Sequence, residues 1–127
     1  MPVTIVNTPD APAPIGPYSQ AVRAGDTLYV SGVIGLDPKT GQLVEGGVAA
    51  QAERVFASLA AIARAAGGSL ANALKLTLYL VDLADFGVVN EQMARAFRAP
   101  FPARATVGVK ALPRGAALEI DAVLHLG

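Results

Sequence analysis

VAAQAERVFASLAAIARAAGG, residues 48–68, and NALKLTLYLVDL, residues 72–83, decide the fold because the spacing of apolar residues changes between them. In the first stretch apolar residues recur at three- and four-residue steps, which predicts an amphipathic helix that ends at Gly67-Gly68. In the second stretch the period is two, which predicts a strand with one face formed by Leu74, Leu76, Leu78 and Leu80.

The segments before this pair predict β-structure. AVRAGDTLYVSG, residues 21–32, contains two extended runs around Ala24-Gly25-Asp26, where glycine gives a hairpin turn its free φ. LDPKTGQLV, residues 36–44, predicts a second turn, with proline and glycine as turn residues. The proline-rich TPDAPAPIGP, residues 8–17, is typical of an ordered loop that leads into the hairpin.

A second helix is predicted after the leucine strand. Asp85 is a suitable N-cap, and an apolar stripe continues to about Phe97, before Pro100 and Pro102 end the helix. The expected order is therefore a β-hairpin, a strand, a helix, a strand, a helix and two strands. This order indicates an α+β fold, a mixed β-sheet backed by two α-helices.

The last two strands are predicted in ARATVGV, residues 103–109, and ALEIDAVLHL, residues 117–126, with the turn LPRG between them. A short turn favours antiparallel pairing, so we expect Arg104 and Glu119 at the same edge of the sheet. Alternation places Arg104, Thr106 and Gly108 on one side of the first of these strands. On the last strand one side is formed by Leu118, Ile120, Ala122, Leu124 and Leu126, and the other by Glu119, Asp121, Val123 and His125.

The composition limits the classes of function. Ten basic and ten acidic residues give a formal net charge of zero, so no bulk basic field attracts nucleic acid. The chain has no cysteine, which excludes disulfides and thiolate metal sites. Its 127 residues are enough for one domain, 1–127, and the hydrophobic share of 53% leaves apolar surface for a subunit interface.

Neither the start of the chain nor its apolar runs indicate secretion or a membrane span. The start, Met1–Val6, lacks the basic and apolar regions of a signal peptide. No uncharged apolar run reaches the roughly 18 residues of a membrane span. We therefore expect a cytoplasmic protein without a membrane partner.

Arg104 stands at the entry of an apolar strand, in FPARATVGV, residues 101–109. It is either a surface arginine at a strand end or a semi-buried cation that needs an anion. A carboxylate matches the guanidinium fork best, either from an Asp or Glu of the chain or from a ligand. Glu119 is open to two interpretations as well, a solvent-facing strand residue or, if it lies near Arg104, a carboxylate that activates water.

Other candidates give weaker signals. His125 is the only histidine, and a lone histidine near a strand end is usually structural. No metal site is indicated, because HxxxH, cysteine and a dense carboxylate cluster are all missing from the sequence. VEGGV and AGG lack the pattern of a phosphate-binding loop. Ser31 and Gly32 in SGVIG, and Tyr18 in GPYSQ, fit either close packing or a pocket wall.

Four blocks, IGPYSQAV (15–22), YVSGVIGLDPKTGQLV (29–44), DFGVVNEQ (85–92) and FPARATVGVKALPRGAALEIDAV (101–123), share the order and spacing of one family. With these blocks the chain resembles the reactive intermediate deaminase A family, RidA, also known as YjgF. The likeness extends from about residue 4 to residue 124. One block alone, such as PARATV, would be weak support, whereas four blocks in register are specific.

The resemblance implies a chorismate-mutase-like fold: a single domain whose mixed sheet is backed by two helices, in a homotrimer with a central barrel. It places the sites in the clefts between subunits. It also implies a 2-iminobutanoate/2-iminopropanoate deaminase, which hydrolyses 2-aminoacrylate and related enamines and imines to 2-keto acids and ammonia. The small-molecule substrate needs no cofactor and no metal.

The resemblance also assigns residues. Arg104 matches the arginine that binds the substrate carboxylate, and Glu119 the glutamate that positions or activates the hydrolytic water. Val33 departs from the glutamine of many members, and Thr106 offers a hydroxyl where others offer a thiol, so substrate preference is open. The positions that match further substrate-binding residues are Tyr18, Ser31, Gly32, Asn90 and Thr106.

Three alternatives to this activity stay open. The same cleft could bind keto acids without turning them over, as a sensor or metabolite sink. It could also hydrolyse a different enamine or imine. A module that acts on RNA or inhibits translation is the third alternative, and zero net charge disfavours it.

Overall fold

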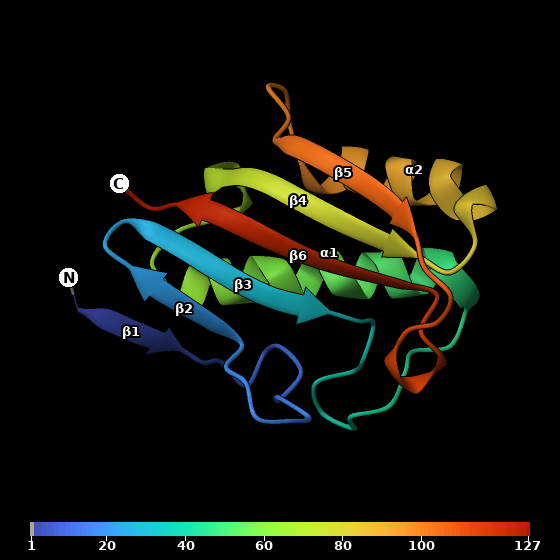
Figure 1. Cartoon of the computed structure of the whole chain (residues 1–127), viewed down its shortest axis with the longest axis horizontal. Helices are drawn as coiled ribbons and strands as arrows, with labels where there is room; N and C mark the ends of the chain where they lie inside the picture. The colour runs from blue at the N-terminus through green and yellow to red at the C-terminus, as the bar shows by residue number, and fades with distance from the viewer. Residues whose placement is uncertain (1) are drawn as a thin grey trace.

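The computed structural model describes residues 2–127, and within them six strands form one mixed sheet with two helices behind it (Figure 1). The order across the sheet is β1-β2-β3-β6-β4-β5, and every neighbouring pair is antiparallel except β4 with β5. The expected α+β architecture is confirmed. The strands are β1 (Val3–Val6), β2 (Ala21–Ala24), β3 (Thr27–Val33), β4 (Ala73–Leu80), β5 (Ala103–Gly108) and β6 (Leu118–His125), and the helices are α1 (Gly47–Ala65) and α2 (Phe86–Ala96).

Helix α1 is the helix predicted after residue 48, and its apolar stripe packs on the sheet. It ends where the sequence indicates, because Gly67 takes a φ of +90° and the N–H of Gly68 donates to the carbonyl of Ala63 at 2.8 Å. A left-handed residue after the last turn is a common helix end. The core side of α1 includes Val55, Phe56, Leu59 and Ile62.

Strand β4 is the predicted leucine strand, with one correction. Leu76, Leu78 and Leu80 are buried as expected, but Leu74 is 52% exposed. The register of β4 against β6 is irregular between Ala73 and Lys75, so the strict alternation starts only after Leu74. A bulge of this kind turns a side chain away from the face that the period of two assigns to it.

The expected pairing of the last two strands is wrong. β5 pairs only with β4, in parallel, and β6 lies between β3 and β4. The reason is the unit β4-α2-β5, because a helix between two strands favours a parallel crossover. The alternate residues Leu118, Ile120 and Leu124 are fully buried, which suits a central strand, whereas β5 has no buried residue and forms the edge.

Other predicted elements are found with small differences. The hairpin over residues 21–32 is β2 with β3, and β1 is an additional strand that the sequence did not indicate. Segment 36–44 forms a turn closed by a single bridge between Leu36 and Leu43, and no strand lies between the hairpin and α1. Asp85 precedes α2, but its side chain makes no capping bond.

The proline-rich loop is ordered, as expected, and Gln20 holds it in place. The side-chain Oε1 of Gln20 accepts from the N–H of Thr8 at 2.8 Å. Its Nε2 donates to the carbonyls of Thr8, Ala11 and Pro12, at 3.0, 3.3 and 2.9 Å. A buried amide with these partners fixes the loop that carries Tyr18 against β3.

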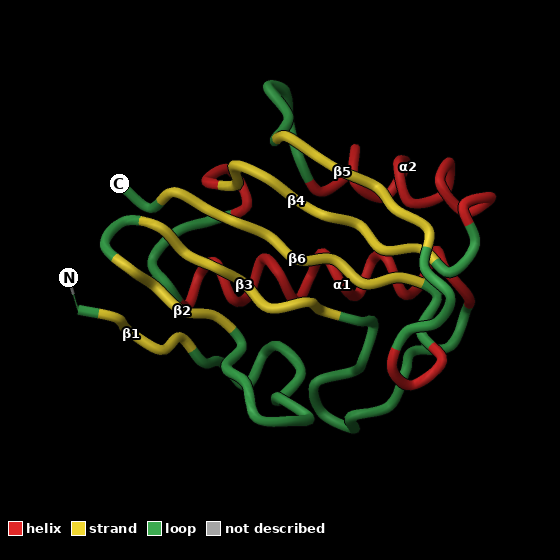
Figure 2. The backbone as a smooth tube through the Cα atoms, viewed as in Figure 1, coloured by secondary structure: helices red, strands yellow, loops and turns green. Residues whose placement is uncertain are grey.

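The second face of the sheet carries no helix within residues 2–127, and Figures 1 and 2 view the molecule from this face. We call it the uncovered face. Several large apolar side chains of the strands are exposed, among them Ile5 at 59% and Tyr29 at 54%. Between residues 2 and 127, no helix is both long enough and apolar enough to cross a membrane.

Candidate functional site

Arg104 lies on the face of the sheet that the helices cover. It pairs with Leu76 of β4, a core residue, and directly opposite residues share a face. The guanidinium carbon is 5.0 Å from the ring centroid of Phe86, and Nη1 donates to Oδ1 of Asn90 and lies 3.7 Å from Sδ of Met93. These three partners belong to α2, so this helix sets the direction of Arg104.

Arg104 borders an open hollow of about 330 Å³. Its lining contains no carboxylate, and the ion pair found within residues 2–127 joins Arg23 to Asp26 instead. The guanidinium is therefore not neutralised by an Asp or Glu of the described chain, and its fork suits an external carboxylate. The other lining residues are Asn90, Met93, Ala94, Phe101 and Pro102.

Thr106 shares the side of Arg104, as the alternation predicts. It pairs with the buried Leu78 of β4. Its Oγ1 is buried and has no hydrogen-bond partner within the described residues. A buried hydroxyl without a partner is costly, so this oxygen has unused hydrogen-bonding capacity beside the arginine.

Glu119 lies on the opposite, uncovered face. It pairs with Tyr79 of β4, and its carboxylate crosses over Gly32 of β3. A Cβ at Gly32 would lie 2.5 Å from Oε2 of Glu119, so this glycine leaves the space that the carboxylate occupies. The register of β3 shifts between Val30 and Val33, which bulges Ser31 and Gly32 toward Glu119.

The pKa of Glu119 is raised above the ordinary glutamate value of 4.5. Burial is the larger cause, because desolvation disfavours the charged carboxylate. The negative charge of Asp121 on the same face of β6 is the second cause. A carboxylate with a raised pKa is a stronger base toward water near neutral pH.

The raised pKa gives a prediction for stability. The folded chain binds the Glu119 proton more tightly than the unfolded chain, so this stabilisation is complete below the ordinary glutamate pKa and is lost as pH rises. We expect Glu119→Gln to be more stable than the wild type at pH 7, with a difference that shrinks toward pH 4.5.

Urea unfolding at the two pH values measures this difference. Glu53→Gln, at an exposed position of α1, is the matched control and should change stability little. A Glu119→Gln chain that is less stable than the wild type at pH 7 would contradict the expected direction.

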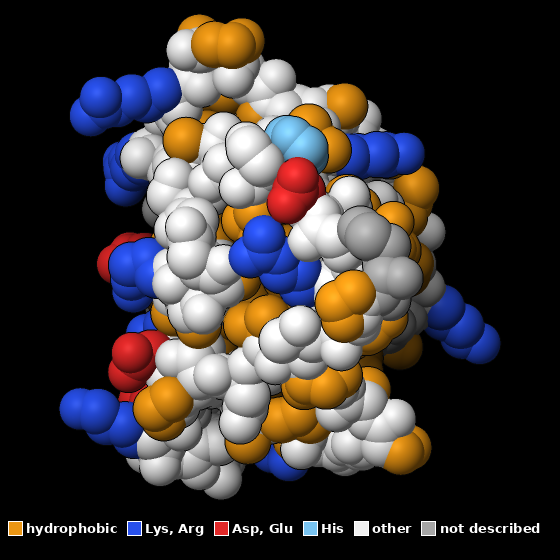
Figure 3. All heavy atoms as spheres, turned by 90° about the vertical axis from the view of Figure 1, so that its left-hand side faces the viewer, with side chains coloured by type: hydrophobic (Ala, Val, Ile, Leu, Met, Phe, Trp, Pro, Cys, Tyr) orange, Lys and Arg blue, Asp and Glu red, His pale blue; other side chains and the backbone are white. Residues whose placement is uncertain are grey.

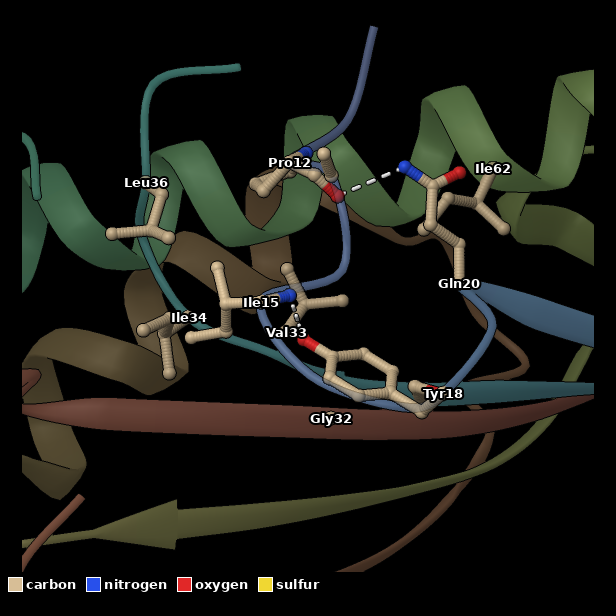
Figure 4. A pocket seen from close by; sticks show the side chains of 11 residues that line it. Pro12, Ile15, Tyr18, Gln20, Gly32, Val33, Ile34, Leu36 and Ile62 are labelled. Carbon is tan, nitrogen blue, oxygen red and sulfur yellow. Dashed lines mark hydrogen bonds between the residues drawn. The ribbon is translucent and has the colours of Figure 1, made fainter. Parts of the chain in front are cut away.

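Tyr18 closes a small cavity between the proline-rich loop and β3 (Figure 4). Its hydroxyl accepts from the N–H of Ile15 at 3.3 Å, and its ring lies over the bulged strand near Gly32. The cavity measures about 30 Å³, which is room for a water molecule rather than a substrate. Ser31 is fixed nearby, because its Oγ donates to the carbonyl of Ser19 at 2.6 Å.

The sequence-predicted residues form two groups in one chain. The arginine group is Arg104 with Asn90 and Thr106, and the glutamate group is Glu119 with Tyr18, Ser31 and Gly32. Arg104 of β5 and Glu119 of β6 pair with different residues of β4, three positions apart, and β4 lies between their two strands. The offset is roughly 10 Å along the strands and roughly 10 Å across them, on opposite faces.

Comparison with known proteins identifies the family. The family model described as endoribonuclease L-PSP matches residues 8–126. A mouse protein named 2-iminobutanoate/2-iminopropanoate deaminase is 49% identical over 123 residues, which cover 97% of this chain and 91% of the mouse protein. The chain belongs to the RidA family.

Two solved structures show how closely this RidA chain follows the family fold. RidA from the Antarctic bacterium Psychrobacter sp. PAMC 21119 is 48% identical, with a TM-score of 0.94 and coverage of 96% and 98% of the two chains. E. coli TdcF with bound serine is 36% identical, with a TM-score of 0.93 and coverage of 98% and 99%.

Sequence reasoning missed several neighbours of the two groups in this RidA chain. Phe86 and Met93 contact Arg104, and the apolar stripe predicted for this helix gave no sign of these contacts. Tyr79 lies opposite Glu119, and only the register of β4 against β6 shows it, whereas Asp121 is on the side of β6 that the alternation predicts. Within the described residues no group of three His, Asp or Glu side chains is placed to hold a metal ion.

Proposed function

We propose that this RidA chain is an enamine and imine deaminase that converts 2-imino acids to 2-keto acids and ammonia. The observation that carries the proposal is the arginine that α2 holds beside an open hollow without a protein carboxylate. A carboxylate on the carbon that bears the nitrogen is the shared feature of 2-aminoacrylate, which becomes an imine by tautomerisation, and 2-iminobutanoate. The name of the mouse relative and the serine bound to TdcF support a ligand with a carboxylate.

The active site, in this proposal, forms between two copies of the chain in a homotrimer. Arg104 and Glu119 lie on opposite faces of one sheet and cannot reach one small substrate together within one chain. A neighbouring copy that places its Glu119 face opposite the Arg104 hollow brings them together. The exposed apolar side chains of the uncovered face, such as Ile5 and Tyr29, favour burial against another copy.

The proposed reaction needs two functions. Arg104 binds the substrate carboxylate through parallel N–H···O bonds, and this fixes the adjacent imine carbon. Glu119 accepts a proton from water as the water oxygen bonds to that carbon. Glu119 returns this proton to the nitrogen, which gives a carbinolamine. The proton of the new hydroxyl then moves to the nitrogen as the C–N bond breaks, and keto acid and ammonia leave. The imine is already electrophilic, so the step requires no cofactor.

A mixing experiment tests the composite site. Arg104→Ala and Glu119→Gln are each expected to be inactive, but co-expression should restore about one quarter of the wild-type rate per site. A restored site takes its arginine from the Glu119→Gln subunit and its glutamate from the Arg104→Ala subunit, and random association in a closed ring makes one site in four.

The rate is measured with 2-aminoacrylate released in place by a threonine dehydratase, and subunit mixing is checked by mass spectrometry. A chain that carries both substitutions, mixed with the wild type, controls for dilution of sites. Mixed trimers without any recovery would contradict a site shared between copies.

Two alternatives use the same Arg104 hollow. A keto-acid binding protein would bind pyruvate or 2-ketobutyrate but leave the imine to hydrolyse at its uncatalysed rate. A deaminase for another substrate would act on a panel of imines produced by amino-acid oxidases. The assay with the dehydratase separates the first alternative, and the panel separates the second.

RNA cleavage is a further candidate, because the description of the family model names an endoribonuclease. The charge of this chain gives it little support. The formal net charge is zero, and on the face shown in Figure 3 the Lys and Arg side chains lie apart from one another. RNA binding that weakens steeply with salt would favour this candidate.

The single domain over 1–127 and the cytoplasmic location stay predictions.

A further inference from the structure

Two carboxylates lie next to each other at the Glu119 end of the proposed site. Asp121 follows Glu119 by two positions on β6, so both side chains are on the uncovered face. Tyr79 of β4 is directly opposite Glu119 in the register. Its hydroxyl donates to Oδ2 of Asp121 at 2.9 Å rather than to Glu119. One tyrosine therefore stands beside both carboxylates but hydrogen-bonds only one of them.

We propose that Tyr79 is a positioning residue: its hydroxyl holds the Asp121 carboxylate beside Glu119, so that Asp121 acts on Glu119 through its negative charge and leaves proton transfer to Glu119. An O–H that donates to a carboxylate favours the charged form of that acceptor. No donor to the carboxylate of Glu119 is found within residues 2–127, and two adjacent carboxylates resist being charged together. Glu119, the carboxylate without the tyrosine, is therefore the one left to exchange a proton.

The electrostatic surroundings agree with this assignment. The pKa of Tyr79 is raised first by its bond to Asp121, then by burial and by the charges of Asp121 and Glu119, so the phenol stays a donor at neutral pH. Farther along the same face are Lys75 of β4, Tyr29 of β3 and His125 of β6. Neither carboxylate forms an ion pair with any of these groups in the described part of the chain.

The consequence for catalysis rests on the proposed deaminase function. Glu119 has to accept a proton from water and return it to the departing nitrogen. The charge of Asp121 raises the proton affinity of Glu119, and the hydrogen bond from Tyr79 holds Asp121 in place beside it. Tyr79 thus acts on the reaction through Asp121 and Glu119, without touching the substrate.

Carboxyl-carbon NMR titration of Glu119 tests the proposal on the full chain. We expect Tyr79→Phe to lower the Glu119 midpoint by about half a pH unit, because the Asp121 charge is then no longer held beside Glu119. Asp121→Asn should lower the midpoint further, by about one unit, because a charge is removed. Tyr29→Phe is the matched control, since this exposed tyrosine lies on the same face without a hydrogen bond in the described residues, and it should leave the midpoint unchanged.

An unmoved Glu119 midpoint in Tyr79→Phe overturns the proposal, and an unmoved midpoint in Asp121→Asn does so even if Tyr79→Phe fails to fold. The titration does not require turnover, so it tests the role of Tyr79 independently of the proposed deaminase function. If the Glu119 midpoints shift as expected but the chain hydrolyses no imine, the role of Tyr79 is supported and the proposed deaminase function is rejected. In an active chain, the acid limb of kcat/KM should move to lower pH with the NMR midpoint in Tyr79→Phe.

Discussion

Arg104→Ala is expected to lower turnover of 2-aminoacrylate by about 10³-fold while the chain still folds. The loss is large because the guanidinium is the cation beside the open hollow, and no Lys or other Arg lines it. The fold tolerates the change because Arg104 is exposed and its contact with Phe86 is worth about 1 kcal/mol at most at such a site. The measurements are kcat/KM with 2-aminoacrylate generated in situ by the dehydratase, and the midpoint of urea unfolding.

Arg104→Lys separates charge from geometry. Lysine keeps the positive charge but has no planar fork, so it cannot bond a carboxylate bidentately and donate to Asn90 as arginine does. We expect it to be nearly as inactive as the alanine variant. Arg98→Ala is the matched control, because Arg98 is exposed and has no hydrogen bond or ion pair among residues 2–127. Near-normal turnover by Arg104→Ala would reject the carboxylate-binding role.

Glu119→Gln is expected to lower kcat by about 10²- to 10³-fold and to change the binding of 2-ketobutyrate much less. Glutamine fills the same space over Gly32, so the bulged strand keeps its shape. It cannot accept a proton from water, so only the chemical step suffers. Stopped-flow turnover gives kcat, and calorimetric titration with the keto acid gives the affinity.

The pattern of the two effects decides the role of the glutamate. Equal losses of turnover and keto-acid affinity would indicate a structural residue instead of a base. Glu53→Gln on the exposed side of α1 is the control for removing a carboxylate from the chain and should leave both quantities unchanged.

Much of the local structure follows from the spacing of residues. The three- and four-residue steps predict α1 and α2, and the period of two predicts β4 and the buried face of β6. The exception, Leu74, lies beside a bulge, and a bulge depends on the partner strand rather than on the strand itself. β1 was missed for the same reason, since four residues at the chain start form a strand only through their pairing with β2.

The candidate site also depends on strand pairing, which the sequence of a single strand does not give. Periodicity correctly puts Arg104 and Thr106 on one side of β5, and Glu119 and Asp121 on one side of β6. Periodicity does not show whether the two strands are neighbours, or whether the two pairs of residues share a face of the sheet. Each strand has two faces, and either face can be the buried one. The turn LPRG indicated direct pairing of these strands, and that inference was wrong.

Motifs and residue spacing were enough to predict the family, the two helices, the leucine strand and the residue types for binding a carboxylate and moving a proton. The position of Arg104 and Glu119 on opposite faces of the sheet became visible only from the pairing of the strands. The physical reason is the crossover through α2, which makes β5 a parallel edge strand, while the apolar face of β6 is buried between β3 and β4. An arginine and a glutamate fifteen positions apart in the sequence thus belong, in one chain, to two separate half-sites.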